Sequence, residues 1–286
     1  MGVKIEEVAF WSGPAMRMAG RIFHSASGTS PGPGVVFCHG FGGTKEGTPT
    51  GLSTILAEHG YTVLAFDYRG LGASEGGNGR IMPADQVEDA VHALEYLAQR
   101  PEVDGRRMAI YGTSFGGVVV ALAALRSGRP RAAAMAVPVT AGDRWLRSIM
   151  RWHEYVRMKE RAMEAIAKKV MTGQFEMVDR FDIMVPDPVT FDRYRDKVAI
   201  TLESVYHVVN HDAIAEAHRM HTPTLVMGVQ GDLLSPVEQA TDFYERLAGP
   251  KELYLFETGT HFSVYDELLP EVASRTLAWF DRHVRA

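Results

Sequence analysis

The chain has 286 residues, 46% of them hydrophobic, and a formal net charge of −5, which favours one large α/β domain with an insertion over two independent domains. There is no basic stretch of the kind that follows phosphates, and no apolar run approaches the ~20 residues of a membrane helix, so we expect neither a nucleic-acid nor a membrane partner. Cys38 is the only cysteine, which excludes an internal disulfide, and the N-terminus is acidic where a signal peptide would be apolar, so we expect a cytoplasmic protein.

The first segments of the chain predict a pair of antiparallel strands. Val3–Trp11 and Met16–Ser25 alternate between apolar and polar side chains, and residues 12–14 between them are typical of a turn. Strand and helix patterns then alternate, which indicates βαβ units and a mostly parallel sheet with helices on both faces. The further elements that we expect are strands at Gly34–Cys38, Tyr61–Phe66, Met108–Tyr111, Thr224–Val229 and Leu253–Phe256, and a helix at Pro83–Gln99.

The alternation of strands and helices stops after Val137 and resumes at Thr222. In a fold built from βα units, such an interruption is typical of an inserted lid. We therefore interpret residues 141–206 as a helical cap, inserted into a core that consists of residues 1–140 and 207–286.

Within the expected cap, a long amphipathic helix is predicted over residues 143–170, followed by a break at the prolines of residues 186–188. Methionine and aromatic side chains are frequent along this helix, and flexible thioether chains adapt to varied apolar ligands. We expect Met150, Trp152 and Tyr155 to contact a hydrophobic substrate. The alternative is that these side chains only pack the cap onto the core or form a subunit interface.

The sequence G-T-S-F-G at residues 112–116 matches the G-x-S-x-G nucleophile elbow. An apolar run at residues 108–111 predicts a strand before it, and residues 117–125 predict a helix after it, which is the context that the motif requires. On this sharp turn a serine hydroxyl is exposed above the sheet, and small residues two positions before and after it let neighbouring backbones approach. The motif therefore predicts Ser114 as a nucleophile.

A serine hydroxyl needs a base to take its proton and a third group to orient that base. In proteins with this motif, the order along the chain is Ser, then Asp or Glu, then His. Asp232 follows the strand expected at residues 224–229, and His261 follows the strand expected at residues 253–256. We therefore expect Ser114, Asp232 and His261 at one edge of the sheet. The alternatives are that Asp232 only caps the next helix and that His261 has no role.

A candidate oxyanion site follows the strand expected at Gly34–Cys38. The loop H-G-F-G-G at residues 39–43 is rich in glycine, so its backbone amides can turn toward a reacting carbonyl. The expected donors are the amides of Phe41 and Phe115. We interpret His39 as a structural residue that holds this loop by hydrogen bonding.

Together these motifs resemble the α/β-hydrolase superfamily, and more closely the esterase-like branch that includes dienelactone hydrolases and Xaa-Pro-peptidase-like enzymes. The matching pieces are residues 39–46, 66–74, 112–117, 231–232 and 259–261. The resemblance covers the core from about residue 34 onward, whereas residues 141–206 match no motif. It implies an α/β-hydrolase fold with Ser114 as nucleophile, His261 as base and Asp232 as orienting acid.

We expect a serine hydrolase that cleaves a carboxylic ester of a small hydrophobic substrate without a cofactor. The same residues would serve a thioester, amide, lactone or activated carbon–carbon bond, acyl transfer, or a non-catalytic ligand-binding module, and the fold does not choose among them. His207 and His211 have the spacing of zinc ligands but lack an acidic third ligand, so we expect no metal. The oligomeric state stays open, with a homodimer as one option.

Overall fold

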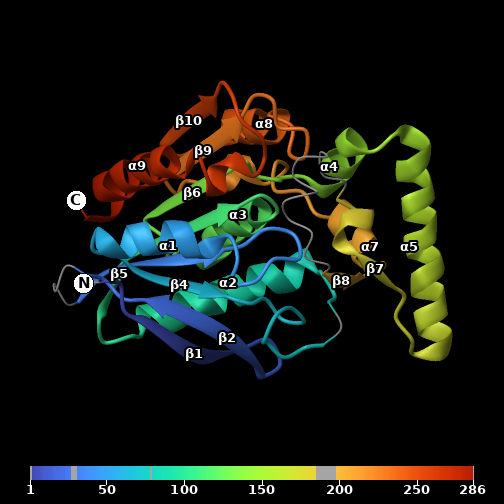
Figure 1. Cartoon of the computed structure of the whole chain (residues 1–286), viewed down its shortest axis with the longest axis horizontal. Helices are drawn as coiled ribbons and strands as arrows, with labels where there is room; N and C mark the ends of the chain where they lie inside the picture. Colours follow the sequence, from blue (N-terminus) through green and yellow to red (C-terminus); the bar gives the residue numbers. More distant parts are fainter. Residues whose placement is uncertain (1, 27–30, 78, 185–197, 286) are drawn as a thin grey trace.

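An eight-stranded sheet lies at the centre of the computed structural model, which describes residues 2–26, 31–77, 79–184 and 198–285. The strand order is β1-β2-β4-β3-β5-β6-β9-β10 (Figure 1). The strands are β1 Ile5–Ser12, β2 Met16–Phe23, β3 Gly32–Cys38, β4 Thr62–Phe66, β5 Val103–Thr113, β6 Ala132–Ala136, β9 Thr224–Val229 and β10 Lys251–Phe256.

The direction of the strands agrees with the sequence pattern. β1 and β2 form the predicted antiparallel pair, with Ile5 opposite Phe23 and Ser12 opposite Met16. β2 also runs antiparallel to β4, and the pairs from β4 through β10 are parallel. Because parallel strands end at the same edge of a sheet, the loops after β3, β5, β9 and β10 lie together at that edge.

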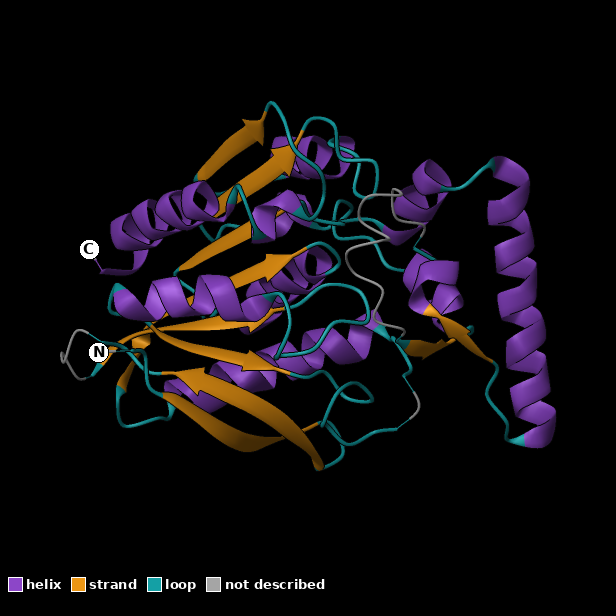
Figure 2. Ribbon diagram, in the orientation of Figure 1, coloured by secondary structure: helices purple, strands orange, loops and turns teal. Residues whose placement is uncertain are grey.

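Helices cover both faces of the sheet, so its central strands are buried on both sides (Figure 2). Side chains of α2, α3 and α8 pack in one apolar cluster, and those of α1 and α9 pack in the other. Alternate residues of β3 divide between the two clusters: Val36 and Cys38 belong to the first, Val35 and Phe37 to the second. These helices are α1 Pro49–Glu58, α2 Pro83–Ala98, α3 Gly116–Ser127, α8 Glu238–Arg246 and α9 Leu269–Phe280.

The segment between β6 and β9 departs from the strand–helix alternation, and Figure 1 shows it beside the sheet with one helix, α5, at the outer edge. Its elements are α4 Gly142–Ile149, α5 Trp152–Thr172, β7 Met177–Asp179, β8 Ala199–Thr201 and α7 Ser204–Val209. The two ends of this inserted segment meet at a narrow neck. There the amide of Gly142 donates to the carbonyl of His211 (2.9 Å), and the amide of Ala213 donates to that of Thr140 (2.7 Å).

The single helix expected over residues 143–170 is two helices in the structure. Met150 and Arg151 both have extended backbone, with ψ of 152° and 150°. The amide of Arg151 donates to the carboxylate of Glu154 (3.0 Å), so α5 begins anew after the break. The break expected at residues 186–188 lies outside the described residues.

Within the described ranges, no helix is both long and apolar enough to cross a membrane.

The inserted segment is fastened to the core at a second place, around the buried carboxylate of Glu203. This carboxylate accepts from Nε of Arg80 in the core (2.5 Å) and pairs with Lys169 of α5. Beside it, the amide of Ile81 donates to the hydroxyl of Ser204 (2.9 Å). The neck and Glu203 together fix the inserted segment against the carboxyl edge of the sheet.

His211 at the neck should make the stability of the protein depend on pH. Burial, with a smaller contribution from the charge of Arg126, lowers the pKa of His211 to about 4. The ordinary pKa of a histidine is about 6.5. At a pH between this value and the lowered pKa, His211 binds a proton in the unfolded chain but not in the folded chain. The free energy of unfolding therefore falls as the pH falls through this range. Urea unfolding of wild type and His211→Asn from pH 8 to pH 4 measures the effect. We expect a shallower pH dependence in the variant, and equal slopes would contradict this role.

Candidate active site

Ser114 stands at a sharp turn between β5 and α3 with a backbone conformation that non-glycine residues rarely adopt. Its φ is +53°. Three backbone hydrogen bonds hold it there: its amide donates to the carbonyl of Ala136 (3.1 Å), and its carbonyl accepts from Gly117 and Val139 (both 2.8 Å). A strained residue persists only where its surroundings determine it in this way, which is typical of functional sites.

The glycines around the turn allow the close approach that the motif predicts. A Cβ on Gly116 would lie 2.2 Å from the carbonyl oxygen of Cys38, and one on Gly112 would lie 2.8 Å from the carbonyl oxygen of Gly116. Gly40 packs directly on the nucleophile candidate, since its Cβ would lie 3.0 Å from Cβ of Ser114. The turn therefore requires the absence of side chains at these three positions.

Asp232 and His261 meet at the same edge of the sheet. Nδ1 of His261 lies 2.7 Å from Oδ2 of Asp232, and both side chains are buried. Because a carboxylate only accepts, this bond requires the proton on Nδ1 and leaves Nε2 of the ring as an acceptor. The other oxygen of Asp232 accepts from the amides of Leu234 and Ser235 (both 2.8 Å). Asp232 thus braces its own turn and also orients the imidazole.

A cavity of about 430 Å³ lies at this edge, and both Ser114 and His261 line it. Besides Ser114, its walls come from residues 40–51 after β3, the loop after β10, and the inserted segment. The inserted segment contributes Arg180, Met184 and Val198. The cavity has the size of a small-molecule site, with an apolar wall and a few polar groups.

The expected oxyanion donors, the amides of Phe41 and Phe115, have no hydrogen-bond partner among the described residues. Phe115 is the N-cap residue of α3, and Phe41 lies in the loop after β3 and lines the cavity. A helix N-terminus beneath the serine adds a positive dipole end, which favours a developing negative charge.

An aromatic cluster forms around Phe41 and Phe115, and its third member is Trp145, from the segment expected as a cap. The ring of Trp145 lies 5.5 Å from that of Phe41 and 5.8 Å from that of Phe115. Its Nε1 donates to the carbonyl of Leu234 (2.7 Å), beside Asp232, and the side chain is fully buried. A buried indole N–H group needs a hydrogen-bond partner. The sequence alone does not show that Trp145 is buried or which group accepts from it, so it could not single out this residue.

His39 holds the loop after β3, as the sequence predicts. Its Nδ1 donates to the carbonyl of Gly40 (2.9 Å). Burial lowers the pKa of His39, which keeps the ring neutral. Cys38 precedes it at the end of β3, and burial raises the pKa of this thiol to about 12.

The three cap residues expected at the substrate lie elsewhere in the structure. Trp152 is 65% exposed, Met150 is half-buried, and the hydroxyl of Tyr155 donates to Asp143. None of the three is among the described residues that line the cavity. The reason is the break at residues 150–151, after which α5 turns away from the sheet. These residues thus do not line the cavity that contains Ser114, and their contact with a substrate stays a prediction.

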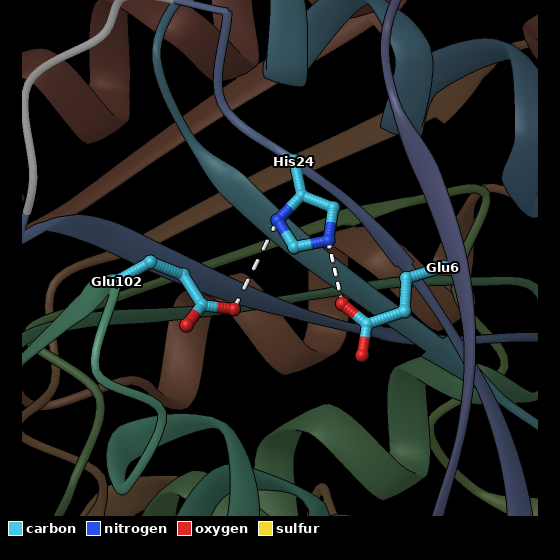
Figure 3. Close-up of side chains that lie close together, drawn as sticks. All are labelled: Glu6, His24 and Glu102. Carbon is cyan, nitrogen blue, oxygen red and sulfur yellow. Dashed lines mark hydrogen bonds and ion pairs between the residues drawn. The ribbon is translucent and has the colours of Figure 1, made fainter.

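One cluster of described residues has the chemistry of metal ligands, and it lies far from the cavity. Figure 3 shows the ring of His24 between two carboxylates, 2.8 Å from Oε2 of Glu6 and 3.9 Å from Oε1 of Glu102. The guanidinium of Arg100 pairs with the same two carboxylates (3.0 and 2.9 Å). Glu102 precedes β5 whereas Ser114 follows it, so the cluster is an ion-pair network at the opposite edge of the sheet.

Gly116→Ala should destabilise the protein strongly, because the new Cβ would clash with the backbone of β3 rather than with a movable side chain. We expect a loss of at least about 2 kcal/mol in the free energy of unfolding, measured by urea denaturation. Gly47→Ala is the matched control, since the nearest atom to its Cβ is 4.0 Å away. Equal stability of the two variants would contradict the tight elbow.

Comparison with known proteins assigns the chain to a family. A family model described as serine aminopeptidase, S33, matches residues 29–267. An Escherichia coli protein described as an uncharacterized 31.7 kDa protein in the traX-finO intergenic region is 27% identical over 92% of this chain and 95% of its own length. Thiohydrolase aneE of Aspergillus aculeatus is 24% identical over 89% of this chain and 86% of its own. Acyltransferase drtE of Aspergillus calidoustus is 24% identical over 93% of this chain and 90% of its own length.

Solved structures show the same fold. A complex of DcsB with its substrate analogue superposes with a TM-score of 0.88 at 18% identity, over 99% of this chain and all of that chain. The α/β hydrolase GrgF of Penicillium sp. sh18 superposes with a TM-score of 0.86 at 21% identity, over the same shares. The predicted α/β-hydrolase fold, with a mostly parallel sheet and helices on both faces, is confirmed.

Proposed function

Because the chain belongs to the serine aminopeptidase S33 family of α/β hydrolases, we propose that it hydrolyses an acyl bond of a small molecule through Ser114. One observation carries the proposal. Ser114, at a strained turn, shares a cavity with His261, whose Nδ1 is held by Asp232 at 2.7 Å. This arrangement has the parts that a serine nucleophile needs: a base, a group that orients the base, and oxyanion donors.

The proposed reaction proceeds in two steps. Nε2 of His261 takes the proton of the Ser114 hydroxyl as Oγ attacks the substrate carbonyl, and the amides of Phe41 and Phe115 bind the resulting oxyanion. The protonated imidazole then gives its proton to the leaving group, and an acyl-enzyme remains. Water, deprotonated by His261, hydrolyses the acyl-enzyme and restores Ser114. Asp232 holds the Nδ1 tautomer and stabilises the imidazolium. The mechanism requires no cofactor.

We propose that the inserted segment, residues 141–206, acts as a cap on the core. In support, Arg180, Met184 and Val198 line the cavity with Ser114, and Trp145 packs against both oxyanion residues. A cap in this place limits the access of water and contributes to substrate selection, whereas the reacting groups belong to the core.

A carboxylic ester is the default substrate, and a second candidate is a thioester or acyl transfer to a non-water acceptor. This second candidate is favoured by the names of two relatives that span most of the chain, a thiohydrolase and an acyltransferase. The two candidates share every residue of the proposed mechanism and differ in the leaving group or acceptor. Product analysis on a panel of esters and thioesters, with added alcohols or amines, separates them.

A fluorophosphonate probe should label one serine, Ser114, because only an activated hydroxyl reacts with it at neutral pH. Ser114→Ala should lose both the label and turnover on the substrate panel while keeping the wild-type unfolding midpoint. Mass spectrometry of the labelled peptide identifies the site. A label on another serine, or full turnover by the variant, would refute the assignment.

Asp232→Asn should lower kcat by about 10³–10⁴-fold, since an amide at this position favours the wrong imidazole tautomer. His261→Ala should be as damaging as Ser114→Ala, because the two side chains act as one unit. The carboxylate of Asp266 also lines the cavity. Asp266→Asn is therefore the matched control and should retain most of kcat. If Asp232→Asn keeps the wild-type kcat, another acid orients the base.

A further inference from the structure

The first inserted helix, α4, is bonded to the part of the core that follows Asp232. Oε1 of Gln239, in α8, accepts from the amides of Thr140 (2.9 Å) and Ala141 (3.0 Å), and Ala141 is the N-cap residue of α4. The carbonyl of Ala141 accepts in turn from the amide of Trp145 (2.9 Å). Figure 1 shows α4 at the edge of the sheet where the loops of the candidate site lie. These bonds fix the start of α4 and therefore the backbone of Trp145.

The indole ring of Trp145 is also fixed in orientation. It packs against the rings of Phe41 (5.5 Å) and Phe115 (5.8 Å), and these two rings lie 5.5 Å from each other, so the three rings form a closed triangle. The side chain of Trp145 is fully buried. Because densely packed core side chains have few alternative rotamers, its Nε1 is directed at one acceptor, the carbonyl oxygen of Leu234 at 2.7 Å.

This carbonyl belongs to a peptide group whose N–H serves Asp232. The peptide bond between Leu234 and Ser235 is planar, so its carbonyl and its N–H point in opposite directions. The carbonyl accepts from Nε1 of Trp145, and the N–H, which is the amide of Ser235, donates to Oδ1 of Asp232 (2.8 Å). Oδ2 of the same carboxylate lies 2.7 Å from Nδ1 of His261. A line of hydrogen bonds therefore runs from Trp145 through one peptide group and Asp232 to the imidazole.

We propose that Trp145 is a positioning residue, which orients His261 through the peptide group of Leu234 and Ser235 and the carboxylate of Asp232. The inference rests on the proposed function, since it assigns His261 the role of base. A hydrogen bond to a carbonyl polarises the peptide group and strengthens the bond that its N–H donates. Leu234 is only 2% exposed, so loss of the indole N–H leaves its carbonyl buried without this donor. The peptide group then has less reason to keep its N–H on Asp232.

The position of Trp145 separates this role from substrate binding and from ordinary packing. Trp145 is not among the described residues that line the cavity, so its loss should leave substrate binding unchanged. Another buried tryptophan, Trp279 of α9, packs in the other apolar cluster and is 4% exposed. Its Nε1 has no hydrogen-bond partner among the described residues. Trp279 therefore offers a matched control, in which a buried indole is lost without loss of a hydrogen bond to the site.

The kinetics of fluorophosphonate labelling at Ser114 test the proposal. Trp145→Phe keeps an aromatic ring and removes the N–H. We expect its maximal rate constant of labelling to fall about tenfold, as for the loss of one hydrogen bond, and its half-saturating probe concentration to stay unchanged. Trp279→Phe should keep both wild-type values. Equal maximal rate constants in wild type and Trp145→Phe would overturn this inference and leave the proposed function intact, whereas an unlabelled wild type would refute both.

An isosteric analogue separates the hydrogen bond from packing if Trp145→Phe is unstable. Benzothienylalanine has the shape of tryptophan with sulfur in place of the indole N–H, so at position 145 it removes the bond and retains the ring contacts. The proton between Nδ1 of His261 and Asp232 gives a nuclear magnetic resonance signal far downfield of the amides. We expect this signal to move upfield with the analogue at position 145, because the hydrogen bond weakens, and to stay in place with the analogue at position 279. An unmoved signal with wild-type labelling kinetics would overturn the proposal.

Discussion

The left-handed backbone of Ser114 is the constraint to which the rest of the structure adapts. A φ of +53° at a residue with a side chain is costly, and three backbone hydrogen bonds from β6 and the loops around it maintain it. In this turn, β3 runs beside β5, and the carbonyl oxygen of Cys38 at the end of β3 lies against Gly116. The order of the central strands, the glycines of two loops and the start of α3 all serve this one conformation.

The inserted segment contributes to the candidate site in two ways: some of its residues line the cavity, and Trp145 packs against Phe41 and Phe115. Trp145 links the first inserted helix to Phe41, to Phe115 and to the turn that carries Asp232. The positions of Phe41 and Phe115 thus depend on packing contributed by a segment that matches no motif.

Much of the fold and the candidate site could be predicted from the sequence, because the signals are local. The G-x-S-x-G turn, the strand runs and the order of Ser114, Asp232 and His261 each follow from a few adjacent residues. The helix break at residues 150–151 has no glycine or proline to announce it. Trp145 and Trp152 are seven residues apart and share one helical phase, yet one is fully buried and the other 65% exposed. Only the tertiary contacts of α4 distinguish them.

The burial of Cys38 has a consequence for the conditions under which the protein can work. Cys38 is the last residue of β3, beside the turn of Ser114. Because the pKa of its thiol is about 12, the thiol stays protonated at neutral pH. Oxidants attack the thiolate, so peroxide or disulfide stress finds no reactive sulfhydryl in the chain. The sole sulfhydryl of the protein therefore lies beside the turn of Ser114 without adding a redox-sensitive group to it.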